Sequence, residues 1–179
     1  MSKAFTKDEG SASDDPVVVP PRASLPDGAT NYVTPRGLRL LREELAALDV
    51  ERESSSTRPT DDPEHRRLRL ILDARVAALA ERIATATLVD PRATSHDEVR
   101  FGARVTVRDD EGKERTVRIV GVDESDVTRG DIAFVAPLAR ALLGKRRGEA
   151  ALVRTPRGEE ELEVIEIDYA VDPDPAPAD

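Results

Sequence analysis

The spacing of apolar residues changes once along this 179-residue chain, and the change divides it into two kinds of structure. Before about residue 90, apolar residues recur every three or four positions, which is typical of helices that pack along one stripe. After about residue 96 they alternate with polar residues, which is typical of strands with one buried face. The sequence therefore predicts an α+β protein, with a helical segment at 32–90 and a small sheet domain at 96–171.

The segment 32–90 is expected to form two helices joined by a polar turn at 54–60. Thr34 before Pro35 and Asp62 before Pro63 are typical helix starts, because the first side chain caps free N–H groups and proline lacks one. The apolar stripe of the first helix is formed by Leu38, Leu41, Leu45 and Leu48. That of the second is formed by Leu68, Leu72, Val76, Leu79 and Ile83. Matching stripes predict an antiparallel coiled-coil hairpin, and two helices folded back onto the second domain are the alternative.

The segment 96–171 is expected to form a small antiparallel sheet with one helix packed on it. Apolar and polar residues alternate from Val99 to Val107, and a turn at 109–112 leads to a return strand. Pro137 is expected to open a helix that ends at Gly144. The further strands are expected at 116–122, 132–135, 151–154 and 161–169.

Composition narrows the functions that such a chain can carry. The tails 1–31 and 172–179 are rich in Ser, Asp, Ala and Pro, which predicts disordered segments. The net charge of -9 opposes binding to free nucleic acid, so we expect contact with nucleic acid only inside a complex with a protein partner. No apolar run reaches the roughly 18 residues of a membrane span, and no secretory signal is visible. We therefore expect a cytoplasmic protein that has no membrane partner.

The sequence patterns of a self-contained active site are missing. The chain has no cysteine, which excludes a disulfide framework, a thiolate metal site and a cysteine nucleophile. Neither a glycine-rich phosphate loop nor a Gly-x-Ser-x-Gly elbow is present. His65 and His96 lie in different segments without metal-ligand spacing. We therefore expect no catalytic residue, no metal site and no cofactor of its own, and we predict that the chain is not an enzyme.

Five motifs, in their order and spacing, resemble the Gre transcription elongation factors, especially the GreB-like members. They are Asn31–Leu38 with Leu41–Leu45, Val99–Val107, Arg118–Glu124, Pro137–Lys145 and Thr155–Gly158. The resemblance implies an N-terminal coiled-coil hairpin and a C-terminal domain with an FKBP-like fold. It also implies bacterial RNA polymerase as the partner of a monomeric protein. The C-terminal domain would dock near the secondary channel of the polymerase, and the hairpin would enter that channel.

The resemblance also implies where site residues lie. In cleavage-stimulating members, acidic residues at the hairpin tip help to hold a second Mg²⁺, and the polymerase then cuts its own backtracked RNA. Mg²⁺ shared with the polymerase active site is thus the one cofactor that the resemblance implies. The acidic candidates at this tip are Asp61, Asp62 and Glu64. The candidates for docking on the polymerase are Val135, Ala136, Pro137 and Arg140.

Three features depart from the family pattern. The acidic run of the family tip is missing, and Asp62 and Glu64 are also interpretable as a helix cap and a first-turn charge. The hairpin is shorter by about a dozen residues, which removes about 9 Å of reach at about 1.5 Å per residue. Val135-Ala136 stands where the family often has an acid or Asn followed by Ser. The arginines near the tip are Arg58, Arg66, Arg67 and Arg69. We therefore predict weak or absent stimulation of transcript cleavage.

Three alternatives stay open from the sequence. The chain can occupy the channel without stimulating cleavage, as inhibitor-type Gre homologues do. The regulator of nucleoside diphosphate kinase has a similarly shortened arm but a different N-terminal motif. An FKBP-like fold also suggests peptidyl-prolyl isomerase activity, which needs an aromatic-lined pocket, although fold alone does not carry function. The aromatic residues available to that pocket are Phe101, Phe134 and Tyr169.

Overall fold

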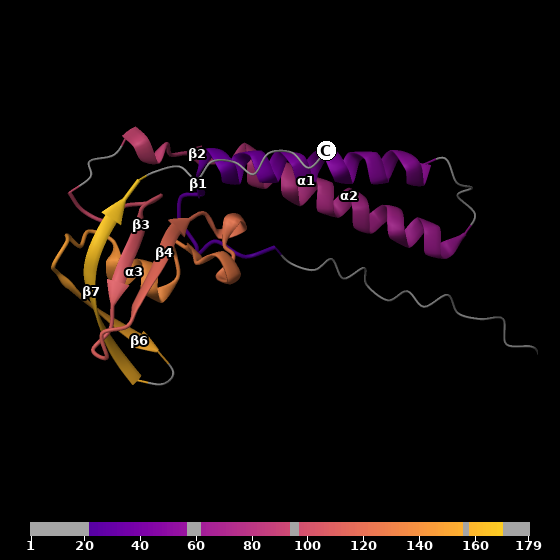
Figure 1. Ribbon diagram of the computed structural model, residues 1–179. Coiled ribbons are helices and arrows are strands. Elements are labelled where there is room, and N and C mark those ends of the chain that lie inside the picture. Colours follow the sequence, from indigo (N-terminus) through magenta and orange to yellow (C-terminus); the bar gives the residue numbers. More distant parts are fainter. Residues whose placement is uncertain (1–21, 57–61, 94–96, 156–157, 170–179) are drawn as a thin grey trace, which may run out of the picture.

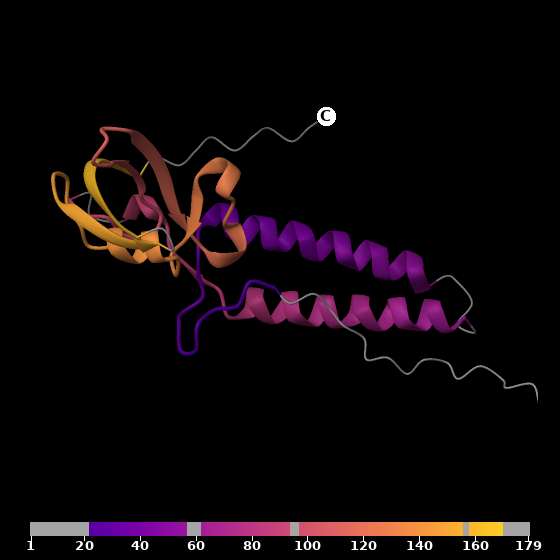
Figure 2. The same cartoon turned by 90° about the horizontal axis from the view of Figure 1, so that it is seen from below.

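The computed structural model describes residues 22–56, 62–93, 97–155 and 158–169. Its elements fall into a pair of long helices and a curled five-stranded sheet, each with its own hydrophobic core (Figure 1). The fold class is therefore α+β, as predicted. The helices extend away from the sheet and approach it at their bases (Figure 2). The alternative in which they fold back onto the sheet is wrong.

The helices α1 (Pro35–Ser56) and α2 (Pro63–Ala84) run antiparallel, side by side. Both begin at the predicted prolines, and each has 22 residues, so each is about 33 Å long. The predicted stripes form the seam. Its buried members are Leu41, Leu48, Leu72 and Leu79, with Leu38, Leu45, Val76 and Ile83 partly buried. The exception is Leu68, in the second turn of α2, which is 40% exposed.

Short strands tie the two ends of the helical pair together. The strand β1 (Tyr32–Val33) precedes α1, and β2 (Thr87–Leu88) follows α2. They pair in parallel, with Tyr32 opposite Thr87. The backbone pairing continues beyond the end of β2, since the N–H of Val89 donates to the carbonyl of Val33 at 2.9 Å. The chain therefore enters and leaves the helical pair at one point, beside the sheet.

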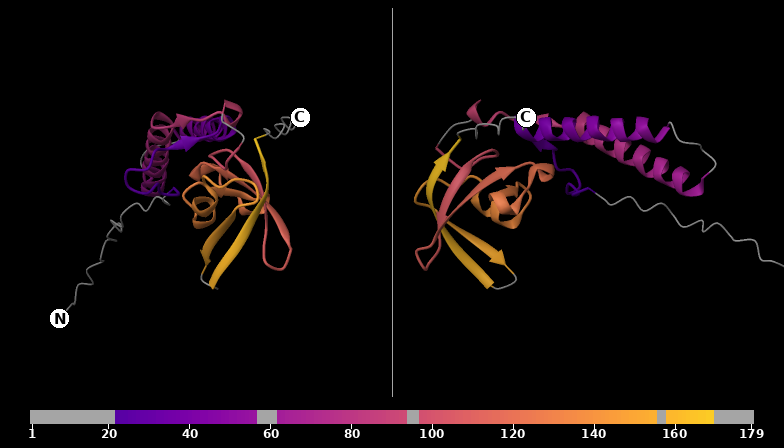
Figure 3. Two further views of the ribbon diagram at one scale, coloured as in Figure 1. Left: turned by 90° about the vertical axis from the view of Figure 1, so that its left-hand side faces the viewer. Right: turned by 45° about the vertical axis from the view of Figure 1, so that its right-hand side comes forward.

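The five-stranded sheet has the order β5-β4-β3-β7-β6. Its strands are β3 (Arg104–Arg108), β4 (Glu114–Val120), β5 (Asp131–Ala133), β6 (Ala150–Thr155) and β7 (Gly158–Asp168). The helix α3 (Pro137–Leu142) packs against β6. The long β6–β7 hairpin points away from the helical pair (Figure 3). The buried face is lined by aliphatic side chains, including Val105, Ile119, Leu142, Leu162 and Val164.

The sheet is mixed, so the prediction of a wholly antiparallel sheet is wrong. The strand β5 pairs with β4 in parallel, with Asp131 opposite Arg118. A tight hairpin turn would have reversed the chain, but two 3-10 turns intervene, and β5 then runs beside the last three residues of β4. These turns are η2 (Val122–Glu124) and η3 (Val127–Arg129). The crossover matters for function because it carries η2 to the base of the helices.

Several predicted strand boundaries differ from the structure, and glycines explain two of the differences. The strand expected at 99–107 begins only at Arg104, because Gly102 has a φ of 87° and lies against Pro91. The strand expected at 116–122 spans Glu114–Val120 instead. It ends before Gly121, whose position lies so close to the carbonyl of Tyr32 that an added Cβ would be 2.8 Å from that oxygen. The chain turns here to pass the base of the helices.

Residues 22–31 were expected to belong to a disordered tail, and this prediction is wrong for them. The Asn31 side chain is buried, and its amide nitrogen donates to the carbonyl of Arg82 at 2.8 Å and to the Thr85 hydroxyl at 3.2 Å. Arg22 donates to carboxylates of Glu44 and Asp123. A few specific polar side chains thus hold a segment whose average composition is that of a solvated tail. The rest of this tail, residues 1–21, and the tail 172–179 lie outside the described residues.

Candidate functional site

The tip of the helical pair carries the acidic candidates. Asp62 is the N-cap of α2, and its carboxylate accepts from the backbone N–H of Glu64 at 3.0 Å. Glu64 is exposed in the first turn of α2, where a negative charge complements the helix dipole. Asp61 and Arg58 lie outside the described residues. Among the described residues, no cluster of three or more metal-ligating side chains is present. In this structure Asp62 thus caps α2, and Glu64 lies in its first turn.

Two buried polar atoms lie at the same end. The hydroxyl of Ser55, in the last turn of α1, is buried, and so is Nε2 of His65, in the first turn of α2. Neither atom makes a hydrogen bond within the structure. A buried polar group without a partner costs about 1–3 kcal/mol. Asn31 Oδ1 and Asp123 Oδ2, at the other end of the helical pair, also lack a hydrogen bond, so such atoms occur at both ends.

The docking candidates lie in the sheet part, far from the tip acids (Figure 1). Val135 and Ala136 are half-buried, and they form the turn between β5 and α3. Pro137 and Arg140 are exposed on α3. We call residues 135–137 the docking segment. The turn is fixed by the backbone N–H of Ala136, which donates to the carbonyl of Ala133 at 2.8 Å.

A buried group of charged side chains joins the helical pair to the sheet. In this base cluster, Arg36 of α1 donates from one terminal nitrogen to Glu124 of η2 at 3.0 Å and to Asp131 of β5 at 3.2 Å. Arg118 of β4 grips the same Asp131 with two hydrogen bonds of 2.9 and 3.0 Å. Both carboxylates are almost completely buried. Arg129 lies at 3.6 Å from the same Asp131 carboxylate. Two buried anions are thus matched by three guanidinium groups, and a dry interior tolerates buried charges that are paired in this way.

A further member of the base cluster is Thr34, which caps α1. Its hydroxyl accepts from the backbone N–H of Gly37 at 2.9 Å and donates to the carboxylate of Glu124 at 2.5 Å. The Glu124 carboxylate therefore lies at the positive end of α1, where helix dipoles favour anions. A Cβ at position 37 would be 2.7 Å from this carboxylate. The glycine therefore allows the direct approach of η2 to the helix start.

A second ion-pair group, the outer cluster, lies on the neighbouring side of the base. Arg22 holds Glu44 of α1 through two bonds of 2.8 and 2.9 Å and also donates to Asp123 at 3.1 Å. Asp123 is in turn paired with Arg82 of α2 at 3.2 Å. The bond from Arg22, despite an opposing effect of burial, lowers the pKa of Glu44 below its usual range. The N-terminal segment, both helices and η2 are thus linked through four charges.

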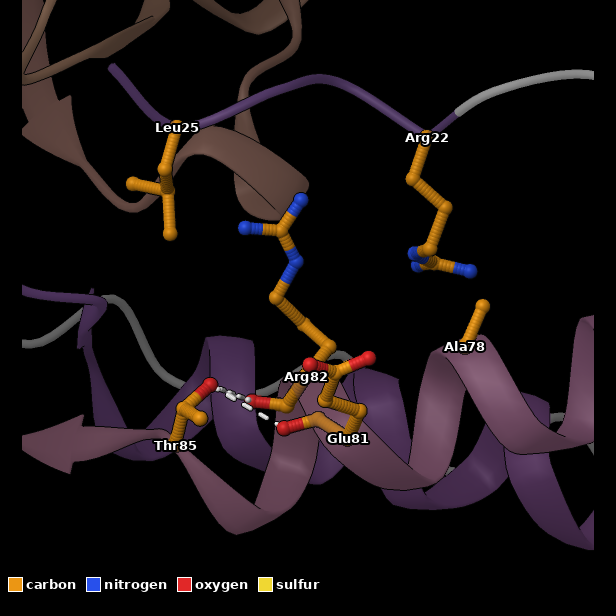
Figure 4. A pocket seen from close by; sticks show the side chains of 6 residues that line it. All are labelled: Arg22, Leu25, Ala78, Glu81, Arg82 and Thr85. Atoms are coloured by element: carbon orange, nitrogen blue, oxygen red, sulfur yellow. Dashed lines mark hydrogen bonds between the residues drawn. The ribbon is translucent and has the colours of Figure 1, made fainter. Parts of the chain in front are cut away.

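A hollow of about 340 Å³ lies between the N-terminal segment and α2 (Figure 4). It is lined by Arg22, Leu25, Ala78, Glu81, Arg82 and Thr85. The figure shows the two guanidinium groups of its wall, and both already pair with the outer cluster carboxylate of Asp123. Neither cation is therefore available to an anionic ligand.

The aromatic residues divide between the core of the sheet and the joint between the sheet and the helical pair. Tyr169 is buried, and its hydroxyl donates to the carbonyl of Glu98 at 2.6 Å; burial raises the pKa of this phenol. Phe101 and Phe134 pack instead with Tyr32 of β1, with ring centroids 5.7–5.8 Å apart. These three rings border an open hollow of about 470 Å³. Tyr32 is a member of this group that the sequence analysis did not foresee.

The base cluster was also missed from the sequence. Its residues stand inside the quoted motifs Asn31–Leu38 and Arg118–Glu124, but nothing in one sequence shows that these motifs meet. A signal was available in Thr34-Pro35-Arg36-Gly37, since a glycine in the first turn of a helix indicates a close neighbour. The structure brings together the start of α1, η2 and β5, and it leaves the tip acids and the docking segment apart.

The molecule thus consists of a long helical pair that buried ion pairs fix to a small sheet. In the described part of the chain, no helix has the length and apolar character needed to cross a membrane. The chain belongs to the GreA/GreB family of transcription elongation factors. The sequence model for the C-terminal part of this family, described as "Transcription elongation factor, GreA/GreB, C-term", matches residues 94–169.

Relatives that align along most of their length support this assignment. The transcription elongation factor GreB of Neisseria meningitidis serogroup B is 36% identical over 155 residues, which cover 78% of this chain and 94% of that protein. GreB of Pseudomonas aeruginosa is 35% identical over 163 residues, covering 84% and 95%. GreA of Alkalilimnicola ehrlichii is 35% identical over 153 residues, covering 77% and 97%. The resemblance seen in the five motifs is therefore confirmed.

Solved structures of similar proteins include Gre factor homologues. GreA factor homolog 1 of Thermus thermophilus is 22% identical, with a TM-score of 0.38 over 78% of this chain and 99% of that one. The GreA/GreB factor of Nitrosomonas europaea is 21% identical, with a TM-score of 0.39 over 77% and 98%.

Proposed function

We propose that this chain binds bacterial RNA polymerase through its sheet part, which has an FKBP-like fold, and inserts its helical pair, a coiled-coil hairpin, into the secondary channel. Membership of a family of transcription elongation factors supports the partner. The two-part shape supports the division of labour, because the docking segment and the tip lie at different ends of the molecule. Residues 96–171 are then the anchor, and residues 32–90 are the inserted arm.

We further propose that the arm occupies the channel with little or no stimulation of transcript cleavage. The observation that carries this proposal is the hydrogen bond from the backbone N–H of Glu64 to Asp62, which uses the Asp62 carboxylate as a helix cap. The cap leaves Asp62 Oδ2 free, but it directs the carboxylate toward the backbone of α2, whereas Mg²⁺ needs tight octahedral geometry at about 2.0–2.1 Å. Arg66 and Arg67 are exposed beside this cap and oppose a second cation.

Of the three aromatic candidates of the isomerase alternative, Phe101 and Phe134 border a hollow together with Tyr32. Tyr169, one of its three aromatic candidates, belongs to the sheet core, and its hydroxyl is committed to the backbone of Glu98 and Arg100. The remaining rings, Phe101 and Phe134, pack against Tyr32 at the base of the helices. We therefore assign these rings to the joint between the two parts.

Site-specific crosslinking tests the insertion of the arm. Because the chain has no cysteine, Arg67→Cys near the tip and Glu111→Cys in the β3–β4 turn can each carry one crosslinker on the full-length protein. In complexes with polymerase, position 67 should crosslink to the segments that line the secondary channel, and position 111 should not. Equal crosslinking from both positions, or none from position 67 in a verified complex, contradicts the proposal.

A matched substitution tests the docking surface. Arg140→Glu reverses an exposed charge beside the docking segment and should weaken polymerase binding without unfolding the chain. Arg146→Glu, also exposed but outside α3, is the control. If the two variants bind polymerase equally well, α3 is not part of the docking surface.

A further inference from the structure

The strand β5 contacts the base of the helical pair and leads directly into the docking segment. At its first residue, the buried carboxylate of Asp131 accepts a hydrogen bond from Arg36 of α1 at 3.2 Å. The same carboxylate is fixed from the sheet side by Arg118, which stands opposite it in the β4–β5 pairing. The beginning of β5 is thus joined to the helices by one residue, Arg36, and to the sheet by another.

The other end of β5 makes a second contact with the same base. Phe134 follows the strand, and its ring packs edge-on against Tyr32 of β1 with centroids 5.7 Å apart. The backbone N–H of Phe134 donates to the carbonyl of Val120 at 2.9 Å, which fixes the ring to the sheet. Val135, the first residue of the docking segment, comes next in the chain. A displacement of the docking segment therefore acts on a residue that touches the helical pair.

Close packing around η2 limits sliding between the two parts. Gly37 and Gly121 both stand where an added Cβ would be within 2.8 Å of an oxygen across the joint. The carboxylate of Glu124 is held by Thr34 and Arg36, which come from the cap and first turn of α1. Packed interfaces of this kind have discrete arrangements and do not deform continuously.

We propose that Arg36 is a positioning residue that fixes the direction of the helical pair relative to the docking segment. It is the member of the base cluster that comes from α1 and reaches both η2 and β5. Its guanidinium holds two carboxylates from different elements, a geometry that a shorter or neutral side chain does not reproduce. The use of this direction in binding RNA polymerase rests on the proposed function. The positioning of the helical pair by Arg36 does not.

Removal of Arg36 should loosen the joint and leave the sheet intact. Asp131 keeps its two bonds to Arg118, which lie within the sheet. Glu124 keeps the hydroxyl of Thr34 but loses its cation. The helical pair keeps its own seam, which does not include Arg36. The change should therefore appear as a spread of tip positions and leave both cores folded.

Distance measurements between paired spin labels on the full chain test this proposal. With labels at Arg67→Cys and Glu111→Cys, the unsubstituted background should give one narrow tip-to-sheet distance distribution. Arg36→Gln should roughly double its width, because a population of alternative directions becomes accessible. Arg39→Gln, one turn away and in an exposed pair with Glu43, is the control and should leave the width unchanged.

A second label pair separates loosening from unfolding. Labels at Glu111→Cys and Arg146→Cys both lie in the sheet part, and their distance should not change in Arg36→Gln. If this pair also broadens, Arg36→Lys, which keeps the charge on a shorter side chain, replaces it and should still broaden the tip-to-sheet distance. An unchanged tip-to-sheet width in the folded Arg36 variants, or equal broadening in Arg39→Gln, overturns the proposal.

The same labels distinguish this proposal from the proposed function. The measurement on the free chain needs no polymerase, so a failure of polymerase binding leaves its result standing. Conversely, a chain whose tip crosslinks inside the channel but whose Arg36 variants stay narrow supports the function and removes the positioning role. If the arm enters the channel and Arg36 sets its direction, the Arg36→Gln variant should still bind polymerase. Its crosslinks from position 67 should then spread over more sites on the polymerase.

Discussion

At its base the helical pair is tied to the sheet by buried ion pairs, whereas nearer its tip the ion pair of Arg52 with Asp49 on α1 is exposed. The base cluster joins α1, η2, β4 and β5 through Arg36, Arg118, Glu124 and Asp131. At the tip, the hydroxyl of Ser55 and Nε2 of His65 make no hydrogen bond within the structure. Atoms without a hydrogen bond occur at both ends, because Asn31 Oδ1 and Asp123 Oδ2 at the base also lack one. The difference between the two ends therefore lies in the buried ion pairs at the base, which we propose set the direction of the helices.

The largest effect should come from breaking the seam near the base. Leu79 is fully buried and Leu68 is 40% exposed, although both belong to the predicted stripe. Leu79→Asp should lower the free energy of unfolding of the helical part by at least about 3 kcal/mol, because it buries an unpaired charge. Leu68→Asp, near the tip, should cost much less. Thermal melting followed by circular dichroism at a helical wavelength compares them, and equal losses would remove the contrast between the two ends.

Arg36 should give the next largest effect on stability. Arg36→Gln leaves Glu124 without a cation in a buried site and should cost about 3 kcal/mol, the usual range for breaking a buried pair. Arg52→Gln is the matched control on the same helix, because Arg52 pairs with Asp49 on an exposed surface. It should cost less than about 1 kcal/mol. Urea unfolding of both variants gives the comparison, and a similar cost would show that the base cluster is not special.

The two helix caps provide a smaller but well-matched contrast. Thr34 caps α1 at the base and also donates to buried Glu124, whereas Asp62 caps α2 at the tip and is exposed. Thr34→Ala should cost about 2 kcal/mol, because a cap and a partner of a buried carboxylate are lost together. Asp62→Ala should cost about 1 kcal/mol. The order of the two losses in denaturant unfolding is the test, and the reverse order would contradict the account.

The smallest effect concerns the pH dependence of the outer cluster. The bond from Arg22 lowers the pKa of Glu44, so Glu44 contributes stability that is present above its unfolded pKa. This contribution disappears as the pH falls through the lowered folded-state pKa, in the range below about 4.3. Wild type should therefore be slightly more stable than Glu44→Gln at pH 7 and equal to it in strong acid. Glu43→Gln, at an exposed neighbouring position, is the control. A difference that persists unchanged into acid would assign the effect to packing.

The periodic parts of the fold could be predicted from the sequence, and the contacts between them could not. The leucine spacing and the Thr34-Pro35 and Asp62-Pro63 starts predict both helices, because these signals are local. The parallel β5 could not be predicted, because it depends on a crossover through two 3-10 turns. The segment 22–31 was misjudged, because single residues such as Arg22 and Asn31 decide its packing.

In the candidate site, too, local features could be predicted from the sequence and contacts between distant segments could not. Asp62 as a cap follows from its place before Pro63, and the structure confirms it. Arg36 looked like one surface arginine among many, because its two carboxylate partners lie about ninety residues away in the chain. Asp61 stays a prediction, since it lies outside the described residues.

The measurement that tests the central claim most directly follows RNA shortening in backtracked elongation complexes after addition of the full-length protein. The account predicts little or no acceleration of cleavage, and a slower reaction when a cleavage-stimulating Gre factor competes for the same channel. Asp61→Ala and Glu64→Ala should then behave like the unsubstituted chain. Strong acceleration of cleavage that is abolished by either substitution would contradict this account, because it would make the tip acids ligands of the polymerase metal.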